Sequence, residues 1–328
     1  MDIIIITPAA PGSKAGNRAT AERWQGLLER SGHQVSVVTE YRGEPCELFL
    51  ALHAWRSYDA VHLFRETWPG KPLVVALTGT DIYGHQYKYP EQTLCSMQAA
   101  DALIGLHAQV GDDIPESFRD KLVTLFQSAD KPAGVPGNGG PATHDFDVCV
   151  IGHLRAEKDS LRAAKAARLL PTTSRIRVLC AGKAHDEHWE KLATQEVDEN
   201  PRFHWLGELE KADVVQLMAN SQLLVMSSVM EGGANVVSEA CRAGLPVIAS
   251  DISGNTGLLG KDYAGYYPVG DTSALAAVLE LAETDSAFLE QLREQVNQLA
   301  SQFTPEKEQE SLERALAFAV QRCSGNES

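Results

Sequence analysis

The stretch SSVMEGGANVVSEACRAGLPVIASD, residues 227–251, holds the pattern that decides the fold. The apolar residues 223–226 predict a buried strand, and the glycine pair at 232–233 breaks it. Residues 235–242 have the apolar spacing of a helix, and Gly244 stands where a helix C-cap belongs. A helix that starts just past a strand's carboxyl end presents free backbone N–H groups and the positive end of its dipole. Such a helix start binds anions, for example a diphosphate.

Two carboxylates lie on either side of this helix start. Glu231 precedes the glycines, and Glu239 follows just over two turns further along. Carboxylates accept charge-assisted hydrogen bonds, so this pair suits the hydroxyl groups of a sugar or a ribose. Two glutamates at this spacing also occur on the exposed face of an ordinary amphipathic helix, and the spacing alone leaves both interpretations open.

Strand and helix signals alternate in both halves of the chain, as parallel sheets with crossover helices require. One domain is predicted at residues 1–128 and a second at residues 147–304, with a linker rich in Pro and Gly at residues 129–146. At about 150 residues per domain, a chain of 328 residues is long enough for two cores. The predicted fold class is therefore α/β, with two similar domains facing a central cleft.

The individual elements can be assigned from periodicity. Strands are expected at residues 3–7, 34–39, 48–52, 72–77, 102–106, 121–126, 147–151, 176–181, 203–206 and 246–250. Helices are expected at residues 17–30, 159–170, 186–197, 210–220, 287–302 and 305–322.

The composition argues against several classes of protein. The chain has 44 acidic and 29 basic residues and a net charge of −15, so we expect no non-specific binding to nucleic acid or to an anionic membrane. No apolar run approaches the roughly 20 residues of a membrane span, and residues 3–6 are too short an apolar segment for a signal peptide. A cytoplasmic location is expected. The six cysteines show no C-x-x-C spacing, which favours reduced packing residues over metal ligands.

Three N-terminal loops follow predicted strands: PAAPGSKAGN (residues 8–17), LHAWR (52–56) and LTGTDIY (77–83). The carboxyl ends of parallel strands share one sheet edge, so the loops are expected to converge where open α/β folds bind ligands. The first loop lacks G-x-G-x-x-G, which argues against an NAD(P) oxidoreductase. Turn formation also explains its glycines, a capped helix start explains His53 and Arg56, and a helix N-cap explains Asp81.

The C-terminal half resembles the donor-binding half of family 4 glycosyltransferases of the GT-B fold. The resemblance rests on residues 227–251, on GYYPVGDTSALAAVLELAETD (265–285) and on IGHLRAEKD (151–159). Family members usually have G-R-L-x-x-E-K-G at the last of these segments. Lys158 matches its lysine, while His153 stands at the arginine and Arg155 follows two residues later. The resemblance also implies that the helix at 305–322 packs on the N-terminal domain.

This resemblance implies a metal-independent hexosyltransferase that binds a UDP-sugar on its C-terminal domain. Fixed cations and helix-end amides stabilise the charge of a departing diphosphate without a metal ion. Glu231 is then expected to hold hydroxyls of the donor sugar and Glu239 the ribose. The catalytic candidates are Glu231, Lys158, Arg155 and His53. The donor-binding candidates are Gly16, His153, Arg155, Lys158, Glu231, Gly232, Gly233, Ala234, Asn235 and Glu239.

Six segments together resemble the selenosugar synthases of selenoneine biosynthesis, a branch of family 4. They are GSKAGNRATAERW, LHAWRS, LTGTDIYGH, GHLRAEKD, EGGANVVSEA and SGNTGLLG. The resemblance implies transfer of a sugar from a UDP-sugar, such as UDP-N-acetylglucosamine, to the selenium of selenophosphate. Selenophosphate is already an anionic, polarisable nucleophile and needs less help from a general base, which fits Thr78 where many relatives have histidine. The acceptor-binding candidates are Gly12, Ser13, Lys14, Asn17, Arg18, His53, Arg56, Thr80 and Asp81.

Other functions remain open at this point. A family 4 transferase that acts on a hydroxyl of a small metabolite or glycan would keep the same donor motifs. A non-catalytic sugar-nucleotide sensor would need no acceptor pocket, and the N-terminal cationic residues argue against it. A nucleotide-sugar epimerase would need ionisable groups on both sides of the sugar.

Overall fold

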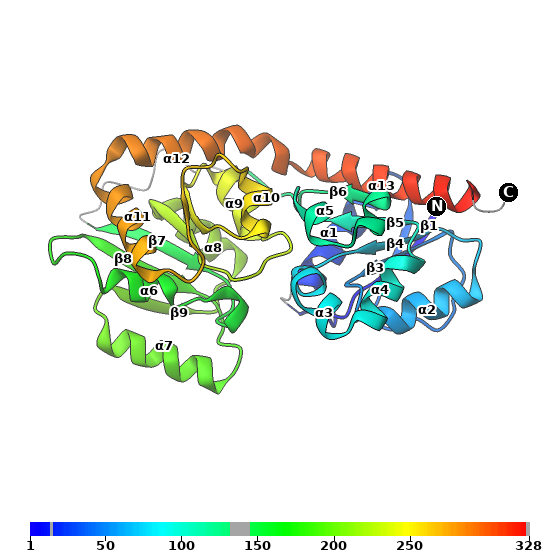
Figure 1. Cartoon of the computed structure of the whole chain (residues 1–328), viewed down its shortest axis with the longest axis horizontal. Coiled ribbons are helices and arrows are strands. Elements are labelled where there is room, and N and C mark those ends of the chain that lie inside the picture. Colours follow the sequence, from blue (N-terminus) through cyan, green and yellow to red (C-terminus); the bar gives the residue numbers. More distant parts are fainter. Residues whose placement is uncertain (14–15, 132–144, 326–328) are drawn as a thin grey trace. The chain divides into compact units, whose positions relative to one another are not determined.

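The computed structural model describes residues 1–13, 16–131 and 145–325, which form two compact units. Unit 1 comprises residues 1–128 and 305–328, and unit 2 comprises residues 129–304 (Figure 1). The linker predicted at residues 129–146 falls mostly on residues 132–144, which lie outside the described residues. Each unit contains one parallel sheet with helices, so the α/β fold class predicted from the sequence is confirmed.

Unit 1 is built on a six-stranded sheet with the strand order β2-β1-β3-β4-β5-β6. All its neighbouring strands pair in parallel. From β1 the chain goes to β2 on one side of β1, and it then crosses to β3 on the other side of β1. The topological switch point therefore lies between β1 and β3. The strands are β1 (Asp2–Ile6), β2 (Gln34–Val38), β3 (Leu48–Leu52), β4 (Leu73–Ala76), β5 (Ala102–Gly105) and β6 (Leu122–Thr124).

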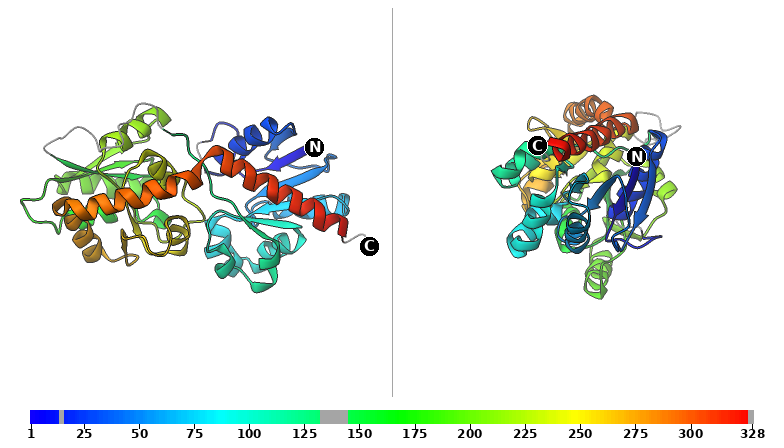
Figure 2. Two further views of the ribbon diagram at one scale, coloured as in Figure 1. Left: turned by 90° about the horizontal axis from the view of Figure 1, so that it is seen from above. Right: turned by 90° about the vertical axis from the view of Figure 1, so that its right-hand side faces the viewer.

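Helices cover both faces of this sheet. One face packs on α1 (Gly16–Arg30) and α13 (Pro305–Gly325), which lie side by side (Figure 2). The other face packs on α2 (Tyr58–Thr67) and α4 (Pro90–Ala99). The short helical segments of unit 1 are the π-helix η1 (Asp81–His85), α3 (Gln86–Lys88), α5 (Val110–Asp113) and the 3-10 helix η2 (Glu116–Lys121).

Helix α13 is anchored by a fully buried carboxylate, Glu308. Its oxygens accept hydrogen bonds from Trp24 Nε1 at 2.7 Å, from the Ser128 backbone N–H at 2.8 Å and from Arg23 Nε at 3.1 Å. A buried carboxylate is tolerated when it is paired and hydrogen-bonded in this way. Four apolar residues of α13 also belong to the core that α1 and the sheet share: Leu312, Ala315, Leu316 and Ala319.

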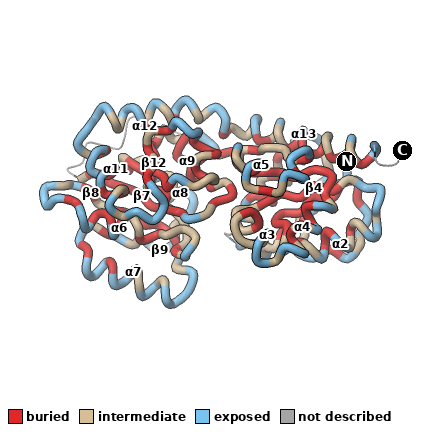
Figure 3. The backbone as a smooth tube through the Cα atoms, viewed as in Figure 1, coloured by how far each residue is buried: buried red, intermediate tan, exposed pale blue. Residues whose placement is uncertain are grey.

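Unit 2 is built on a second parallel sheet, with the strand order β12-β11-β10-β7-β8-β9. Counted within the unit this is the doubly wound Rossmann order, and its switch point lies between β7 and β10. The sheet core is buried, as the red strands in Figure 3 show. The strands are β7 (Phe146–Ile151), β8 (Ile176–Ala181), β9 (Phe203–Gly207), β10 (Leu223–Met226), β11 (Val247–Ser250) and β12 (Tyr266–Tyr267).

Capping residues mark the ends of several helices in unit 2. Asp186, Asp271 and Asp285 are N-caps whose side chains accept from backbone N–H groups, and Gly244 ends its helix at a left-handed φ of 67°, which confirms the predicted C-cap. The helices are α6 (Arg162–Ala167), α7 (Glu187–Glu199), α8 (Lys211–Asn220), α9 (Asn235–Ala243), α10 (Ser253–Leu259), α11 (Thr272–Thr284) and α12 (Ser286–Leu299), with the 3-10 segments η3 (Ala156–Lys158) and η4 (Ala300–Phe303).

Two of the predicted helices differ from the structure. The helix expected at residues 159–170 is only α6, because a 3-10 turn precedes it and Asp159 has a left-handed φ of 44° that an α-helix cannot include. The helix expected at residues 287–302 ends as α12 at Leu299 and continues as η4. None of the helices in the described ranges combines the length and apolarity that a membrane crossing requires.

We expect Glu308→Ala to lower the free energy of unfolding by about 3–5 kcal/mol, because it leaves buried donors without an acceptor. Urea denaturation monitored by tryptophan fluorescence measures this. The matched control on the same helix is Glu310→Ala, whose ion pair with Lys307 has a 62% exposed carboxylate and should contribute less than about 1 kcal/mol. Equal, small effects of both substitutions would contradict the anchoring role of Glu308.

Candidate active site

Two loops of unit 2 meet at its switch point. One loop follows β7 at residues 152–158 and the other follows β10 at residues 227–233, and β7 and β10 are neighbours in the sheet. The loops are joined by hydrogen bonds from the Val229 backbone N–H to the Glu157 carbonyl at 2.9 Å and from Ser227 Oγ to the Asp159 carbonyl at 2.9 Å. The two loops are therefore joined to each other at the sheet edge where such folds bind ligands.

The two loops bring Lys158 and Glu231 into direct contact. Lys158 Nζ donates to Glu231 Oε1, and Ser228 Oγ donates to the same oxygen at 2.6 Å. The two side chains are 19% and 10% exposed, so the pair is largely shielded from water. The sequence predicted each residue at a ligand site, and the structure places them against each other.

Glycines without a predicted role hold the backbone of both loops in place. A Cβ on Gly254, at the start of α10, would lie 2.2 Å from the Glu231 carbonyl oxygen. A Cβ on Gly182, which follows β8, would lie 1.9 Å from the Gly152 carbonyl oxygen. Both positions therefore require glycine. Gly182 directly follows a strand and Gly254 lies in the first turn of a helix, but neither position in the sequence identifies the segment that it contacts.

The two other candidates in the β7 loop, His153 and Arg155, are both half-buried. Burial lowers the pKa of His153 against an opposing effect of Glu208, so its ring is mostly neutral at pH 7. The Arg155 side chain is 43% exposed, with Nε 3.9 Å from a carboxylate oxygen of Glu157. That Nε atom makes no hydrogen bond to any residue in the described ranges. The Arg155 guanidinium can therefore accommodate an anion.

The glycine-opened helix start is α9. Gly233 has a φ of 134°, Ala234 is the N-cap, and Asn235 is the first helical residue. Ala234 offers no side-chain cap, so the positive end of the helix is not covered by its own N-cap residue. Gly232 is buried, and Glu239 lies half-buried within α9.

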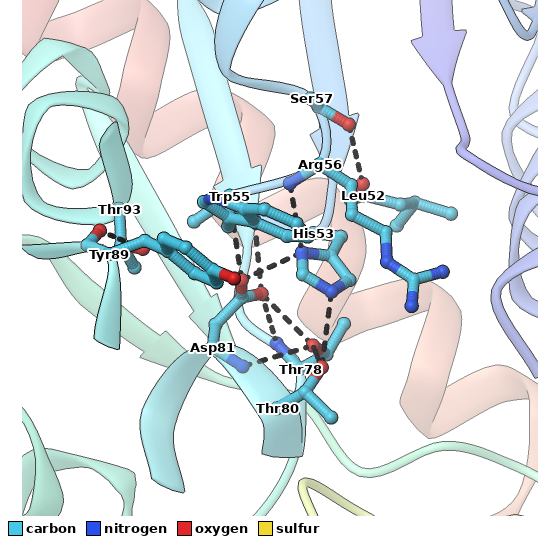
Figure 4. A network of polar contacts seen from close by, with 11 residues as sticks. Leu52, His53, Trp55, Arg56, Ser57, Thr78, Thr80, Asp81, Tyr89 and Thr93 are labelled. Atoms are coloured by element: carbon cyan, nitrogen blue, oxygen red, sulfur yellow. Dashed lines mark hydrogen bonds and ion pairs between the residues drawn. The ribbon is translucent and has the colours of Figure 1, made fainter. Parts of the chain in front are cut away.

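Unit 1 holds a second cluster at the carboxyl ends of β3 and β4, centred on Asp81 (Figure 4). Asp81 is 1% exposed. Its Oδ2 accepts from the backbone N–H groups of Ala54 and Thr78 and from Thr78 Oγ1, each at 3.0 Å. Its Oδ1 accepts from the Trp55 N–H at 3.0 Å and lies 2.7 Å from His53 Nδ1. Asp81 therefore ties two loops together and is not a helix N-cap; Thr80 holds that position.

The contact with Asp81 decides the tautomer of His53. Nδ1 lies 2.7 Å from the carboxylate and 3.2 Å from the Arg56 N–H. We assign the proton to Nδ1, because two acceptors would repel at the shorter distance, and an Nδ1–H cannot also accept from Arg56. Nε2 of a neutral His53 is then an acceptor, and Thr80 Oγ1 lies 3.1 Å from it.

Backbone strain marks the same position. His53 has a φ of 78°, in the left-handed region that non-glycine residues rarely adopt, and its side chain is 2% exposed. Burial alone would raise the pKa of Asp81, but the hydrogen bonds from His53 and from the Thr78 and Trp55 amides outweigh it and lower the pKa. His53 and Asp81 thus form a fixed dyad in which the carboxylate stays ionised and orients the imidazole.

His85 extends this cluster and has no counterpart among the sequence candidates. Its ring lies 5.3 Å from the His53 ring and 4.3 Å from the Trp55 ring. Burial lowers the pKa of His85. Its Nδ1 is buried and has no hydrogen-bond partner among the described residues. A polar atom of this kind suits a ligand group.

Ligand atoms of His53, Asp81 and His85 lie within 4.8 Å of one another, a spacing that also occurs at metal centres. Asp81 already receives five donors, however, and His53 Nδ1 carries the proton that it shares with Asp81. A metal ion would have to displace these bonds. The contacts therefore favour a hydrogen-bonded dyad over a metal site.

The remaining candidates lie in the first N-terminal loop, in the first turn of α1 and at the end of the LHAWR loop. Arg18 Nε donates to Glu22 at 2.6 Å, while its Nη1 is buried without a hydrogen-bond partner in the described ranges. Gly12 has a φ of 77°, and Arg56 is exposed. Gly16 and Asn17 open α1 within unit 1, Ser13 is exposed just before it, and Lys14 lies outside the described residues.

The comparisons with known proteins agree with this arrangement. The family model for glycosyl transferases group 1 matches residues 137–301. Glycogen synthases of two Mycobacterium tuberculosis strains, CDC 1551 / Oshkosh and H37Rv, are 27% identical over 164 residues, which cover 48% of this chain and 39% of theirs. The match thus spans about two fifths of the length of these curated relatives.

Solved structures share the fold over nearly the whole chain. The structure of HepE from Anabaena in complex with UDP and glucose has a TM-score of 0.77 and 16% identity, covering 97% of this chain and 99% of that one. A sucrose-phosphate synthase from Thermosynechococcus elongatus has a TM-score of 0.70 and 14% identity, covering 99% and 98%. At these identities the likeness shows the fold alone, which is that of GT-B glycosyltransferases. Because the family model covers half of its length, the chain belongs to the glycosyl transferases group 1 family.

Proposed function

We propose that this protein transfers a sugar from a UDP-sugar, such as UDP-N-acetylglucosamine, to the selenium atom of selenophosphate. The observation that carries glycosyl transfer is the family match over residues 137–301, which includes both loops at the unit 2 switch point. HepE, which shares the fold, has been solved with UDP-glucose, and this supports a UDP-sugar donor. Selenophosphate is supported by the six segments that resemble selenosugar synthases.

In this reaction the bond between the sugar's anomeric carbon and the diphosphate breaks, and its electron pair leaves with UDP. Lys158, Arg155 and the backbone amides at the start of α9 bind the diphosphate and stabilise that charge. Glu231 accepts hydrogen bonds from the sugar hydroxyls, and Glu239 accepts them from the ribose. These groups perform the electrostatic task that a metal ion performs in other transferases.

The acceptor binds in unit 1, beside Arg18, Arg56 and His53. Its selenium attacks the anomeric carbon, and a carbon–selenium bond replaces the bond to UDP. The Nη1 of Arg18 is buried and has no hydrogen-bond partner among the described residues, which supports an anionic acceptor, because a planar guanidinium holds phosphate oxygens well.

One observation favours a second candidate, a transferase that acts on a hydroxyl group. A hydroxyl acceptor must lose a proton, and the His53–Asp81 dyad offers Nε2 as a base with its other nitrogen fixed by a carboxylate. Thr78, where many relatives have histidine, does not remove this capacity, because His53 supplies an imidazole from the neighbouring loop.

We expect turnover to be independent of divalent metal ions, because cations and helix amides already stabilise the leaving diphosphate. The measurement is UDP release after treatment with EDTA and removal of the chelator, with and without added Mn²⁺ or Mg²⁺. A strict requirement for either ion would contradict this arrangement of the donor site.

Glu239→Ala should weaken the binding of both UDP and UDP-sugar by about 1.5–3 kcal/mol, since it removes a hydrogen bond to a charged acceptor. Calorimetry with each nucleotide measures the loss. Glu190→Ala, at an exposed position of α7, is the matched control and should bind UDP as the wild type does. Unchanged UDP affinity in Glu239→Ala would exclude the ribose assignment.

With a UDP-sugar present, selenophosphate should yield a selenosugar that mass spectrometry detects, and thiophosphate should react more slowly because sulfur is less polarisable. Arg18→Ala should raise the apparent KM for selenophosphate roughly tenfold or more while UDP affinity stays close to wild type. Arg30→Ala, at the exposed end of α1, is the control and should change neither constant.

The same assay separates the two acceptors. Transfer to a sugar or polyol hydroxyl, none to selenophosphate, and loss of that transfer in His53→Gln would establish the hydroxyl acceptor instead. That result would leave the donor assignments of Lys158, Glu231 and Glu239 in place.

A further inference from the structure

Lys158 and Glu231 have separate tasks in the proposed reaction, yet in the structure they bind each other. Lys158 Nζ donates to Glu231 Oε1, which also accepts from Ser228 Oγ at 2.6 Å. The cation expected at the diphosphate and the carboxylate expected at the sugar are thus both engaged by one bond. An anion that binds Lys158 must compete with Glu231 for it.

The backbone around this pair leaves little freedom for the loops to separate. The loops are joined by the bond from the Val229 N–H to the Glu157 carbonyl. The Glu231 backbone also packs closely on α10, where a Cβ on Gly254 would lie 2.2 Å from the Glu231 carbonyl oxygen, so it has no room to move toward that helix. The pair therefore opens by rotation of the two side chains, which are long and rotate readily.

On the basis of the proposed function, we propose that donor binding exchanges the partners of this ion pair. The diphosphate replaces Glu231 as the anion on Lys158, and the freed Glu231 carboxylate receives hydroxyls of the donor sugar. A UDP-sugar supplies both new partners. UDP alone supplies only the diphosphate for Lys158. Glu231 then loses its bond to Lys158 and gains no sugar hydroxyl in return.

The exchange makes the site discriminate between substrate and product. Re-formation of the Lys158–Glu231 bond competes with UDP once the sugar has been transferred, and so promotes UDP release. A hydrogen bond between charged groups typically contributes about 1.5–3 kcal/mol, and every 1.4 kcal/mol is tenfold in affinity. Because both side chains retain some exposure, we expect the lower end of this range, about tenfold.

The decisive variant is Glu231→Gln, which keeps the side-chain shape and removes its charge. Calorimetry without acceptor should show UDP binding about tenfold tighter than in the wild type. UDP-sugar should gain less or bind more weakly, because the amide is a poorer acceptor for its hydroxyls.

Two comparisons separate the exchange from a general effect of charge. Glu157→Gln removes one negative charge from the adjacent loop, and Glu157 faces Arg155 instead of Lys158. It should change UDP affinity less than Glu231→Gln does. In a Lys158→Gln background, Glu231→Gln should no longer tighten UDP, because the bond that it would release is absent.

Unchanged UDP affinity in Glu231→Gln would overturn the exchange, and so would an equal gain in Glu157→Gln or in the Lys158→Gln background. Each of these outcomes leaves the proposed function standing, since UDP still binds. A wild-type protein that binds neither UDP nor a UDP-sugar would overturn the proposed function and the exchange with it. Thermal melting of each variant verifies that the folded state is retained.

Discussion

The parallel pairing of β7 with β10 is the constraint on which the candidate donor site depends. The chain leaves β7 toward β8 on one side and leaves β10 toward β11 on the other, so the two loops emerge next to each other and diverge. Lys158 and Glu231 are 73 positions apart in the sequence and still share a bond for this reason. Gly182 and Gly254 pack closely against the backbone of these loops, so the side chains of Lys158 and Glu231 have more freedom to move than the backbone has.

Unit 1 also has a parallel sheet, but its strand order differs and its polar cluster lies at the ends of β3 and β4. Its cluster is organised by one buried carboxylate, Asp81, which accepts from both the β3 and the β4 loops. The Asp81 carboxylate also accepts from the backbone N–H groups of the two residues after His53. These hydrogen bonds explain how the backbone of His53 is kept at a strained φ of 78°. Asp81 is thus a buried anionic anchor that fixes the backbone of both loops.

Much of the fold was predictable from the sequence, for a physical reason. Strands buried on both faces of a parallel sheet are nearly continuous apolar runs, and residues 48–52 and 223–226 show this plainly. Gly244 ended α9 as its position indicated. The left-handed Asp159, which shortens α6, has no comparable signal, because a non-glycine residue at positive φ depends on its surroundings.

The candidate site was predictable as a list of residues and not as a set of contacts. The positions of strand ends located Glu231, His53 and Asp81, since ligand loops follow strands, and the resemblance to family 4 transferases added Lys158. Which of them bind each other depends on side-chain distances that the sequence does not encode locally. His85 was missed for the same reason, because it is recognised by its packing against Trp55 and by an Nδ1 atom that has no partner in the described part of the chain.

The position of α13 has a consequence for the order in which the chain folds during synthesis. Unit 2 is continuous, from residue 129 to residue 304, whereas unit 1 needs residues from α13 to complete its core. On the ribosome, unit 2 therefore emerges with all of its own elements before unit 1 can close. Until α13 appears, the face of the first sheet beside α1 lacks its cover, and this half-built domain is the intermediate most exposed to aggregation.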